Sequence, residues 1–348
     1  MTNKIYTKNL ILYAPNVHTG GGRVLLSALL KTIDYPMFLL FLDERVKFSL
    51  LGPQATKILF VGRNFFSRLI AELILWYKSR VGMTVLCFHG LPPIFPNGAN
   101  VKIFIQNRLL FERTDFGNHA FSVQLKFYLQ ILILKLCHRS CYQYIVQTPS
   151  MASLIKLRFG NRTKVIVCPF VPTHDWTECL KTEQVPQKYD FAYVASGDAH
   201  KNHDALVDAW IILAKSGVKP TLVFTIDEDR FRPLWARIRH KITSYDLQIL
   251  NLGYQTRNQV YSLYSSVNAV IHASKSESFG LPLIEASELG IPILAPELDY
   301  VRDIVKPVQT FDVNSAVSIA RAVERFLSLD AESSGYMAPR DFLELVTK

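Results

Sequence analysis

The sequence lacks the features that mark several classes of protein. Its five cysteines form no CxxC pair and no zinc-like spacing, which argues against a disulfide scaffold or a structural zinc site. No apolar run reaches the roughly 20 residues that a membrane-spanning helix needs. The first nine residues do not resemble a cleaved secretory signal, and we find no internal repeat or low-complexity tract. The sequence therefore predicts a cytoplasmic globular protein.

Length and charge indicate two domains and an anionic partner. The chain has 348 residues, which corresponds to two domains of about 150 residues each. The chain has 39 lysines and arginines and 29 aspartates and glutamates, which gives a net charge of +10. This excess favours a phosphorylated ligand, a nucleic acid or an acidic membrane surface, without choosing among them.

Short apolar runs alternate with helical patterns in both halves of the chain. Strands are expected at residues 9–14, 37–42, 58–61, 84–88, 101–105, 144–147, 165–168, 191–194, 221–225, 249–252, 269–272 and 293–295. Helices are expected at 24–30, 65–78, 122–138, 205–215, 234–242, 260–265, 282–289 and 316–327. This alternation predicts an α/β protein with one parallel sheet in each half, and a ligand at the carboxyl ends of the strands, in the cleft between the halves.

A connector with three prolines, at residues 169–186, separates the two halves. We expect an N-terminal domain over residues 1–172, a linker over 173–186 and a C-terminal domain over 187–328. Residues 329–348 are expected to return to the N-terminal domain.

The densest group of candidate functional residues follows the strand expected at 269–272. Pro282 suits the first turn of a helix, whose free backbone N–H groups favour phosphate. The groups expected around that phosphate belong to Phe279, Gly280, Leu281 and Leu283. Glu277 and Glu285 lie eight positions apart and can accept hydrogen bonds from sugar hydroxyls on either side. Spacing alone leaves open that Glu277 caps the helix and that Glu285 makes a surface ion pair.

The segment ESFGLPLIE, from Glu277 to Glu285, resembles the E-x7-E motif of the retaining glycosyltransferases of family 4 (glycosyl transferases group 1). The resemblance continues in order from about residue 193 to residue 327. It implies a GT-B fold of two facing Rossmann-like domains, with Glu277 on the hydroxyls of the donor sugar and Glu285 on the ribose of the nucleotide. It also implies no metal and no other cofactor, so Asp227-Glu228-Asp229 is expected to be a solvated loop rather than a DxD metal site.

Residues 193–203 resemble the other donor motif of that family, in which an arginine and, five positions later, a lysine contact the diphosphate. Lys201 matches the lysine, whereas Ser196 stands at the arginine position and leaves one fixed charge fewer. Recognition of the base is expected near Gly253 and Tyr254. A solvated lysine at a helix start is the alternative for Lys201.

The glycine-rich loop after the first strand is a candidate contact across the cleft. Gly21 and Gly22 allow a backbone to approach the donor closely, and His18 in the same loop is a candidate for the acceptor. A plain tight turn explains the glycines equally well.

Two further loops of the first half end strands on the same side. His89 is a third candidate catalytic residue, in addition to Glu277 and Lys201. The alternative is that it is a structural histidine of the loop. Asn107 and Arg108 follow the next strand and are expected near the acceptor.

Two helical stretches combine leucines and aromatic residues with positive charge. Residues 65–78 and 124–139 carry, or lie beside, the cations Lys78, Arg80, Lys126, Lys135 and Arg139. They suit an anionic membrane leaflet, and ordinary packed helices with cationic outer faces are the alternative.

The resemblance implies that a sugar passes from a UDP- or GDP-sugar to a glycan, with a lipid-linked glycan as one candidate, in surface polysaccharide assembly of the bacterial type. The anomeric configuration would be retained, the donor phosphate would take the acceptor proton, and no protein nucleophile would be needed. A GT-B sugar-nucleotide epimerase and a basic nucleic-acid-binding protein are the alternatives. Scattered lysines and arginines disfavour nucleic acid.

Overall fold

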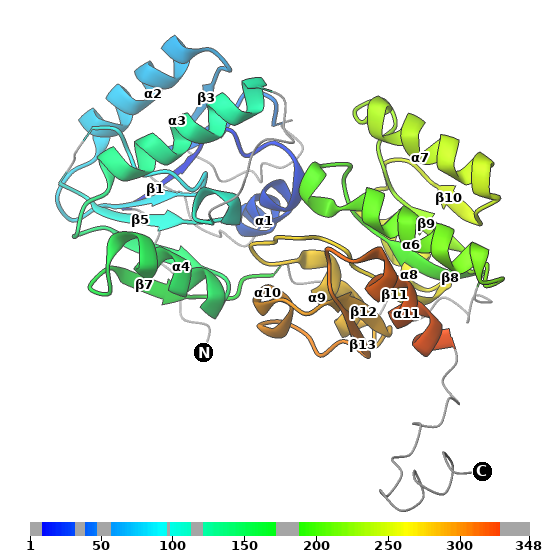
Figure 1. Ribbon diagram of the computed structural model, residues 1–348. Coiled ribbons are helices and arrows are strands. Elements are labelled where there is room, and N and C mark those ends of the chain that lie inside the picture. The colour runs from blue at the N-terminus through cyan, green and yellow to red at the C-terminus, as the bar shows by residue number, and fades with distance from the viewer. Residues whose placement is uncertain are drawn as a thin grey trace, which may run out of the picture.

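The computed structural model describes residues 9–31, 39–46, 57–95, 98–112, 121–171 and 188–327. These residues form two α/β domains that lie side by side (Figure 1). The expected linker at 173–186 and the expected C-terminal tail at 329–348 lie outside the described residues. No helix within the described residues is long and apolar enough to cross a bilayer.

The N-terminal domain is built on a parallel sheet with the strand order β3-β2-β1-β4-β5-β6-β7. Its strands are β1 (Leu10–Ala14), β2 (Leu39–Asp43), β3 (Ile58–Val61), β4 (Thr84–Cys87), β5 (Asn100–Phe104), β6 (Gln143–Val146) and β7 (Lys164–Val167). Neighbouring residues of β1 point to opposite faces. Leu12 packs towards α1 (Gly20–Lys31), and Ile11 packs in a core with α2, α3 and α4. Helices therefore cover both faces of the sheet.

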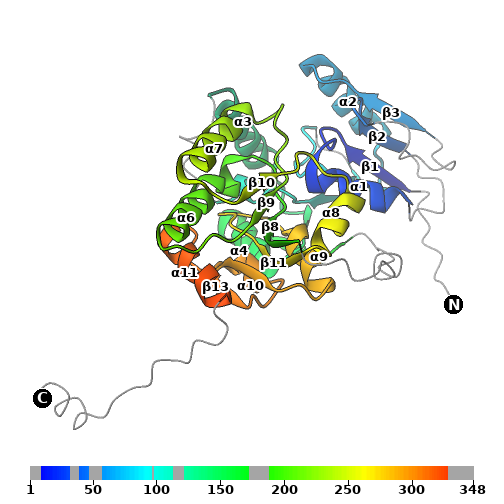
Figure 2. The same cartoon turned by 90° about the vertical axis from the view of Figure 1, so that its right-hand side faces the viewer.

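Local sequence determines where the helices of this domain begin. The side chain of Asn64 caps α2 (Phe65–Lys78) by accepting a hydrogen bond from the Ser67 N–H at 2.7 Å. Thr148 caps α4 (Pro149–Phe159), which has proline in its first turn. The remaining helical elements are α3 (Phe121–Cys137) and the short 3₁₀ helix η2 (Arg108–Leu110). In both views α2 lies away from the C-terminal domain (Figure 1 and Figure 2).

The C-terminal domain repeats this architecture with the parallel strand order β10-β9-β8-β11-β12-β13. Its strands are β8 (Tyr189–Tyr193), β9 (Leu222–Phe224), β10 (Ile249–Asn251), β11 (Val267–Ile271), β12 (Ile293–Pro296) and β13 (Gln309–Phe311). Its helices are η4 (Ala199–Lys201), α6 (His203–Lys215), α7 (Arg232–Tyr245), α8 (Arg257–Tyr264), α9 (Leu281–Glu288), α10 (Asp299–Arg302) and α11 (Ala316–Leu327). The strand order reverses direction between β8 and β11, where Rossmann-like sheets bind ligands.

The two sheets present their carboxyl ends to each other. The Ser278 hydroxyl, in the loop after β11, donates a hydrogen bond at 2.8 Å to the backbone carbonyl of Gln106, which follows β5. Leu281, at the start of α9, packs into the N-terminal core around α1. The predicted pair of facing parallel-sheet domains is therefore confirmed.

Candidate active site

Two loops of the C-terminal domain meet at the β8/β11 switch point. One follows β8 and carries Lys201, and the other follows β11 and carries Glu277. Backbone and side-chain contacts join them, because the carbonyl of His200 accepts hydrogen bonds from the Lys275 N–H at 2.8 Å and from the Ser274 hydroxyl at 3.2 Å. The sheet thus brings together residues that lie 76 positions apart in the sequence.

A nearly buried ion pair lies where these loops meet. The Lys201 ammonium donates a hydrogen bond to Glu277 Oε1, and the two side chains are only 16% and 13% exposed. His272 Nε2 lies 3.6 Å from the same oxygen. Burial alone would raise the pKa of Glu277, but Lys201 and His272 hold that pKa far below its ordinary value. Glu277 is therefore a fixed carboxylate at neutral pH and can accept hydrogen bonds from hydroxyl groups.

The loop after β8 carries no cation at Ser196. The Ser196 hydroxyl donates a hydrogen bond to Asp198 Oδ2 at 2.6 Å, so this position adds a carboxylate neighbour instead of a guanidinium. A Cβ on Gly197 would lie 2.5 Å from Cγ of Phe231, and only glycine fits there. Phosphate bound here would have to rely on Lys201 and on backbone N–H groups.

The start of α9 provides such N–H groups. Gly280 adopts φ +73°, a conformation that glycine reaches without strain, and Pro282 occupies the first turn. Within the described residues, the N–H groups of Phe279 and Gly280 have no protein acceptor. The expectation for Leu283 is wrong, because its N–H donates to the Gly280 carbonyl at 3.0 Å within the tight first turn.

Glu285 lies one turn into α9 in a different electrostatic setting. Its side chain is 15% exposed, and Nη2 of Arg257 lies 3.6 Å from Oε1. Burial raises the pKa of Glu285 to about 7; Arg257 opposes that rise and Glu288 adds to it. A ligand that donates hydrogen bonds to this carboxyl would favour its charged form. Arg257 is a candidate site residue that the sequence patterns did not indicate.

The loop expected to recognise the base leads directly to Arg257. Gly253 adopts φ +70°, and its N–H donates to Asn251 Oδ1 at 3.3 Å. Tyr254 is 73% exposed and follows immediately. This loop ends at Thr256, whose capping box with Gln259 starts α8 and thereby positions Arg257 beside Glu285.

The expected glycine loop is, in the structure, the first turn of α1, and it approaches α9. A Cβ on Gly21 would lie 3.4 Å from Cδ1 of Leu281, and a Cβ on Gly22 would lie 2.8 Å from Oε1 of Gln106. Packing within the N-terminal domain thus accounts for Gly22, whereas a Cβ at Gly21 would make an ordinary van der Waals contact with the C-terminal domain. The same geometry places this loop opposite the start of α9.

His18 and His89 occupy separate environments in the N-terminal domain. His18 Nδ1 lies 3.1 Å from the carbonyl of Asn16. The His89 ring packs edge-on against Tyr13, with ring centroids 5.1 Å apart, and its Nδ1 is buried without a side-chain partner. Burial lowers the pKa of His89 to about 4, so the imidazole is neutral at physiological pH and can exchange hydrogen bonds but not charge.

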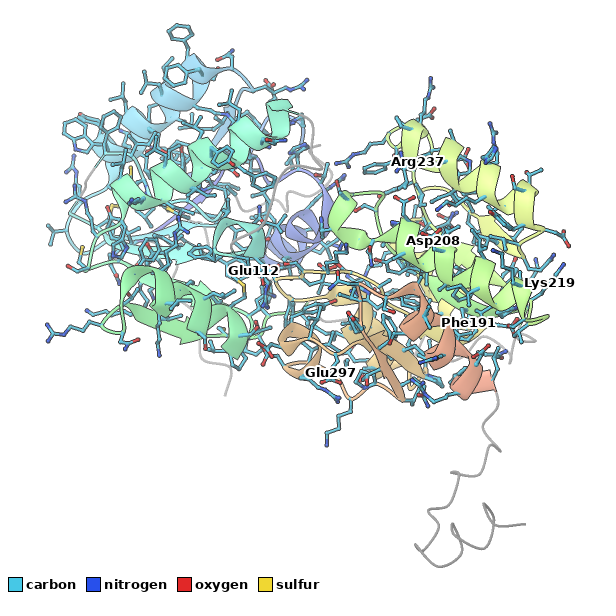
Figure 3. The ribbon with its side chains drawn as sticks, in the orientation of Figure 1. Glu112, Phe191, Asp208, Lys219, Arg237 and Glu297 are labelled. Carbon is cyan, nitrogen blue, oxygen red and sulfur yellow. The ribbon has the colours of Figure 1, made fainter. Side chains whose placement is uncertain are left out.

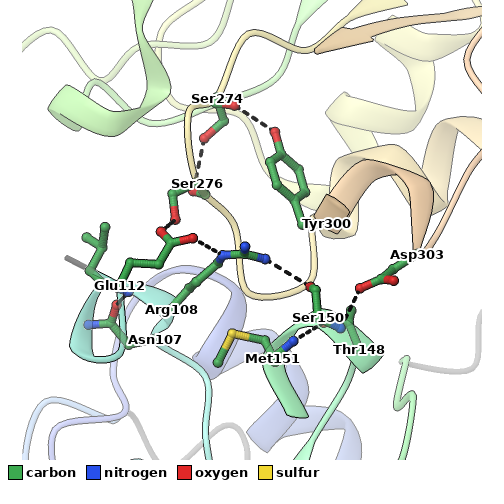
Figure 4. Close-up of polar contacts among 11 residues, drawn as sticks. Asn107, Arg108, Glu112, Thr148, Ser150, Met151, Ser274, Ser276, Tyr300 and Asp303 are labelled. Atoms are coloured by element: carbon green, nitrogen blue, oxygen red, sulfur yellow. Dashed lines mark hydrogen bonds and ion pairs between the residues drawn. The ribbon is translucent and has the colours of Figure 1, made fainter. Parts of the chain in front are cut away.

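Asn107 and Arg108 are engaged at the junction of the two domains (Figure 4). The Asn107 side chain caps η2 by accepting a hydrogen bond from the Leu109 N–H at 3.1 Å. Arg108 pairs with Glu112 and donates to the Ser150 hydroxyl at 3.0 Å. Both candidate acceptor residues therefore make structural contacts in this conformation.

Glu112 links Arg108 to the loop that carries Glu277. Its Oε2 accepts a 2.6 Å hydrogen bond from the hydroxyl of Ser276, the residue before Glu277. Glu112 lies between the two domains in Figure 3. A second bridge runs from the Ser150 N–H to Asp303 Oδ2 at 2.9 Å. No sequence pattern indicates these bridges, because their partners are more than 150 positions apart.

The described residues contain no group of three or more histidine, cysteine, aspartate or glutamate side chains arranged to hold a metal ion. In the DxD-like segment, Asp229 is 91% exposed and pairs with Arg232 at 2.9 Å. Asp227 Oδ1 accepts from the Arg230 N–H at 3.2 Å. The segment forms a solvent-exposed loop.

The raised pKa of Glu285 predicts a pH-dependent stability. Between about pH 4.5 and 7 the folded protein binds a proton that the unfolded chain has lost, so stability falls as pH rises. Glu285→Gln removes this loss of stability. The free energy of unfolding of the variant should therefore exceed that of the wild type by an amount that grows across that window to about 3 kcal/mol. Thermal unfolding from pH 5 to 8 measures it. Glu44→Gln, at an exposed position of the N-terminal domain, controls for charge removal. Parallel curves for Glu285→Gln and the wild type would contradict the assignment.

Sequence comparison identifies the part of the chain that holds this site. Residues 176–339 match the family described as "Glycosyl transferases group 1". A 68-residue segment is 38% identical to the serotype-specific mannosyltransferase WbdA of Escherichia coli. That segment is 19% of this chain, and the chain spans only 8% of the length of WbdA.

Solved structures match nearly the whole chain. Anabaena Alr3699/HepE in complex with UDP-glucose superposes with a TM-score of 0.67 at 14% identity, over 92% of this chain and 90% of that one. The lipopolysaccharide outer core galactosyltransferase WaaB gives 0.60 at 17% identity, over 93% and 91% of the two chains. Sucrose-phosphate synthase from Thermosynechococcus elongatus gives 0.62 at 16%, over 92% and 90%. The chain thus has the GT-B fold, and its residues 176–339 match the group 1 glycosyltransferase family.

Proposed function

We propose that the protein is a retaining glycosyltransferase of family 4 that transfers a sugar from a nucleoside diphosphate sugar to a glycan. The observation that carries the proposal is the charged, nearly buried Glu277, held by Lys201 beside the N–H groups of Phe279 and Gly280, which have no acceptor within the described residues. A carboxylate next to a cation and a helix N-terminus suits a ligand with hydroxyl groups on one side and a diphosphate on the other.

Each part of the donor has a counterpart in this site. The diphosphate would accept hydrogen bonds from the N–H groups of Phe279 and Gly280 and from the Lys201 ammonium. Glu277 would accept hydrogen bonds from the sugar. Glu285 would take the ribose hydroxyls, with Gly253 and Tyr254 near the base.

The proposed reaction needs stabilisation of the leaving group more than it needs an added acid. As the bond to the sugar breaks, negative charge grows on the diphosphate, where Lys201 and the N-terminus of α9 stabilise it. The acceptor hydroxyl would approach the same face of the sugar, and its proton would pass to the departing phosphate. This route uses no protein nucleophile, and it retains the anomeric configuration.

The acceptor would bind on the side of the N-terminal domain. His18 follows β1 and the neutral His89 follows β4, both at the carboxyl edge of that sheet. Asn107 and Arg108 lie at the domain junction, and opening of the Arg108–Glu112 bridge would free Arg108 for an acceptor.

HepE has been solved with UDP-glucose, and WbdA is a mannosyltransferase. UDP- and GDP-linked hexoses are therefore the first donors to test.

Glu277→Gln tests the proposal most simply. The variant should reduce the rate of nucleoside diphosphate release by roughly 100-fold, because an amide accepts sugar hydroxyls less strongly in the transition state. It should stay folded by circular dichroism with a lowered Tm, since Lys201 loses its buried partner. Glu297→Gln removes an exposed glutamate that also pairs with a cation, Arg302, at the outer edge of the same domain (Figure 3), and it should keep wild-type turnover. Near-normal turnover in Glu277→Gln would refute the assignment.

The proposal includes no metal. Turnover measured after dialysis against EDTA should equal turnover with added Mg²⁺ or Mn²⁺, because Lys201 and the α9 N-terminus would supply the positive potential that a metal otherwise gives. Activity that disappears with EDTA and returns with Mn²⁺ would show that this part of the proposal is wrong.

We also propose that α2 and α3 dock on an anionic membrane. Both helices pack on the same core of the N-terminal sheet, yet they leave large apolar side chains exposed: Phe65, Phe66, Ile70, Leu73, Trp76, Tyr77, Leu125, Tyr128, Leu129, Leu132 and Leu136. The only acidic residue on either helix, Glu72, is buried, while Lys78 and Lys135 lie in their last turns. Apolar surface without exposed acidic groups suits an anionic leaflet.

Sedimentation with vesicles tests the membrane surface. The protein should bind phosphatidylglycerol vesicles more tightly than phosphatidylcholine vesicles. Lys135→Gln should weaken that binding about 5-fold, and Phe66→Gln should weaken it further. Val317→Gln, an exposed apolar position on α11, should not change it. Equal binding to both vesicle types, or equal loss in all three variants, would contradict the proposal.

A further inference from the structure

A second cluster of charged residues lies at the carboxyl edge of the N-terminal sheet. It contains Asn16 after β1, Asp43 at the end of β2, Arg45 just beyond it, Arg68 in α2 and Lys126 in α3. None of these residues belongs to the donor site described above. Four separate segments of the chain thus contribute to one small region.

Asp43 neutralises Arg45. Arg45 Nε donates a hydrogen bond to Asp43 Oδ1, and Arg45 Nη2 donates one to Asp43 Oδ2, both at 2.6 Å. Asp43 Oδ2 also accepts from the Asn16 N–H at 3.1 Å, which holds the left-handed turn at Asn16, φ +70°. Although burial opposes it, Arg45 lowers the pKa of Asp43 to about 2. This pair is internally satisfied and makes the cluster rigid.

Arg68 lacks such a partner. It donates to Oδ1 of Asn16, a neutral acceptor that also receives a 3.3 Å hydrogen bond from Arg45. Nε of Arg68 is buried and has no hydrogen-bond acceptor within the described part of the chain. A buried N–H of a guanidinium without an acceptor is costly in a folded protein. A bound anion would supply the hydrogen-bond acceptor that this N–H of Arg68 lacks.

Lys126 adds a further positive charge to the same region. No ion pair to it is found among the described residues. Burial lowers the pKa of Lys126, and repulsion from Arg68 and Arg45 lowers it further. The pKa of His18 is lowered in the same way, by burial and by Arg45 and Lys126, against the opposing effects of the Asn16 carbonyl and Asp43.

In the part of the chain that the structure describes, the other acidic groups nearby already accept hydrogen bonds or face solvent. Glu72 Oε1 accepts a hydrogen bond from the Tyr13 hydroxyl at 2.8 Å, and its Oε2 accepts from the Ile94 N–H at 2.9 Å. Glu44 is exposed, and its Oε1 accepts from the Arg63 N–H at 3.2 Å. The cluster therefore keeps an excess of positive charge from Arg68 and Lys126.

The cluster lies on the acceptor side of the domain junction. Asn16 and His18 immediately precede the glycine loop, and Gly21 of that loop abuts Leu281 at the start of α9. One short segment thus connects the unpaired cations to the proposed donor site. Arg68 and Lys126 also belong to α2 and α3, the helices of the apolar and basic surface.

We propose that Arg68 and Lys126 form a binding site for a phosphate or diphosphate group of the acceptor. This inference rests on the proposed transferase function and specifies its acceptor as a phosphorylated molecule. Phosphate suits the site because several oxygens can accept from the Arg68 fork and the Lys126 ammonium at once. His18 lies beside the bound group and can donate a further hydrogen bond.

Calorimetry with inorganic pyrophosphate tests the site in the full-length protein. The donor site is first saturated with UDP or GDP, so that pyrophosphate reports only a second site. The wild type should bind pyrophosphate under these conditions, and Arg68→Gln and Lys126→Gln should each weaken that binding about 10-fold or more. Lys135→Gln, nine positions further along α3, is the matched control and should bind as the wild type does. Binding that is absent in the wild type, or equal in all four proteins, overturns the proposal.

A stability measurement separates a binding site from a structural cluster. Lys126→Gln removes repulsion among unpaired cations, so it should raise the Tm of the ligand-free protein while it weakens pyrophosphate binding. A lowered Tm in Lys126→Gln together with unchanged pyrophosphate affinity would show a structural role and contradict the site.

Two further binding measurements identify the source of the phosphate. They also distinguish a failure of this inference from a failure of the proposed function. Tighter binding of an alkyl diphosphate in phosphatidylcholine vesicles than of a hexose 6-phosphate indicates a lipid-borne acceptor, and the reverse order indicates a soluble one. If neither UDP nor GDP binds, the donor assignment fails. A titration without nucleotide then still supports the phosphate site if Arg68→Gln and Lys126→Gln lose pyrophosphate affinity, and refutes it if they do not.

Discussion

The structure depends on keeping the charge of Glu277 nearly buried. Removing a carboxylate from water is unfavourable unless a cation or hydrogen-bond donors compensate for it. Lys201 provides the compensation, with the His272 imidazole close by, and both positions follow from the parallel pairing of β8 with β11. The same arrangement keeps both charged groups beside the N-terminus of α9. The ion pair therefore places groups for hydroxyls and for phosphate within one site.

Contacts between the domains connect this site to the N-terminal sheet. Ser276 and Ser278, on either side of Glu277, donate hydrogen bonds to Glu112 and to the Gln106 carbonyl. A change in the relative position of the domains would consequently move the loop that carries Glu277. The unpaired cations of the N-terminal domain lie near the other end of the glycine loop, so the proposed donor and acceptor sites share one structural link.

Elements with strong local signals were predictable from the sequence, and long-range pairings were not. The helices at 65–78 and 316–327 match the prediction because their apolar periodicity is sustained. The three-residue strand β13 is too short to show a pattern. The positions of Glu277 and Glu285 followed from the motif, whereas Arg257, Glu112 and the cluster around Arg68 depend on tertiary contacts. Leu283 was misassigned because its N–H closes the tight turn at Gly280.

The central claim is that a nucleoside diphosphate sugar binds between Lys201 and the start of α9. The most direct measurement is thermal unfolding of the wild type and Lys201→Gln with a panel of UDP- and GDP-sugars. A ligand at 100 times its Kd should stabilise the wild type by about 2.7 kcal/mol, and the same concentration should stabilise Lys201→Gln far less. A panel in which no compound shifts the Tm of the wild type, or in which Lys201→Gln shows the full shift, would contradict the account.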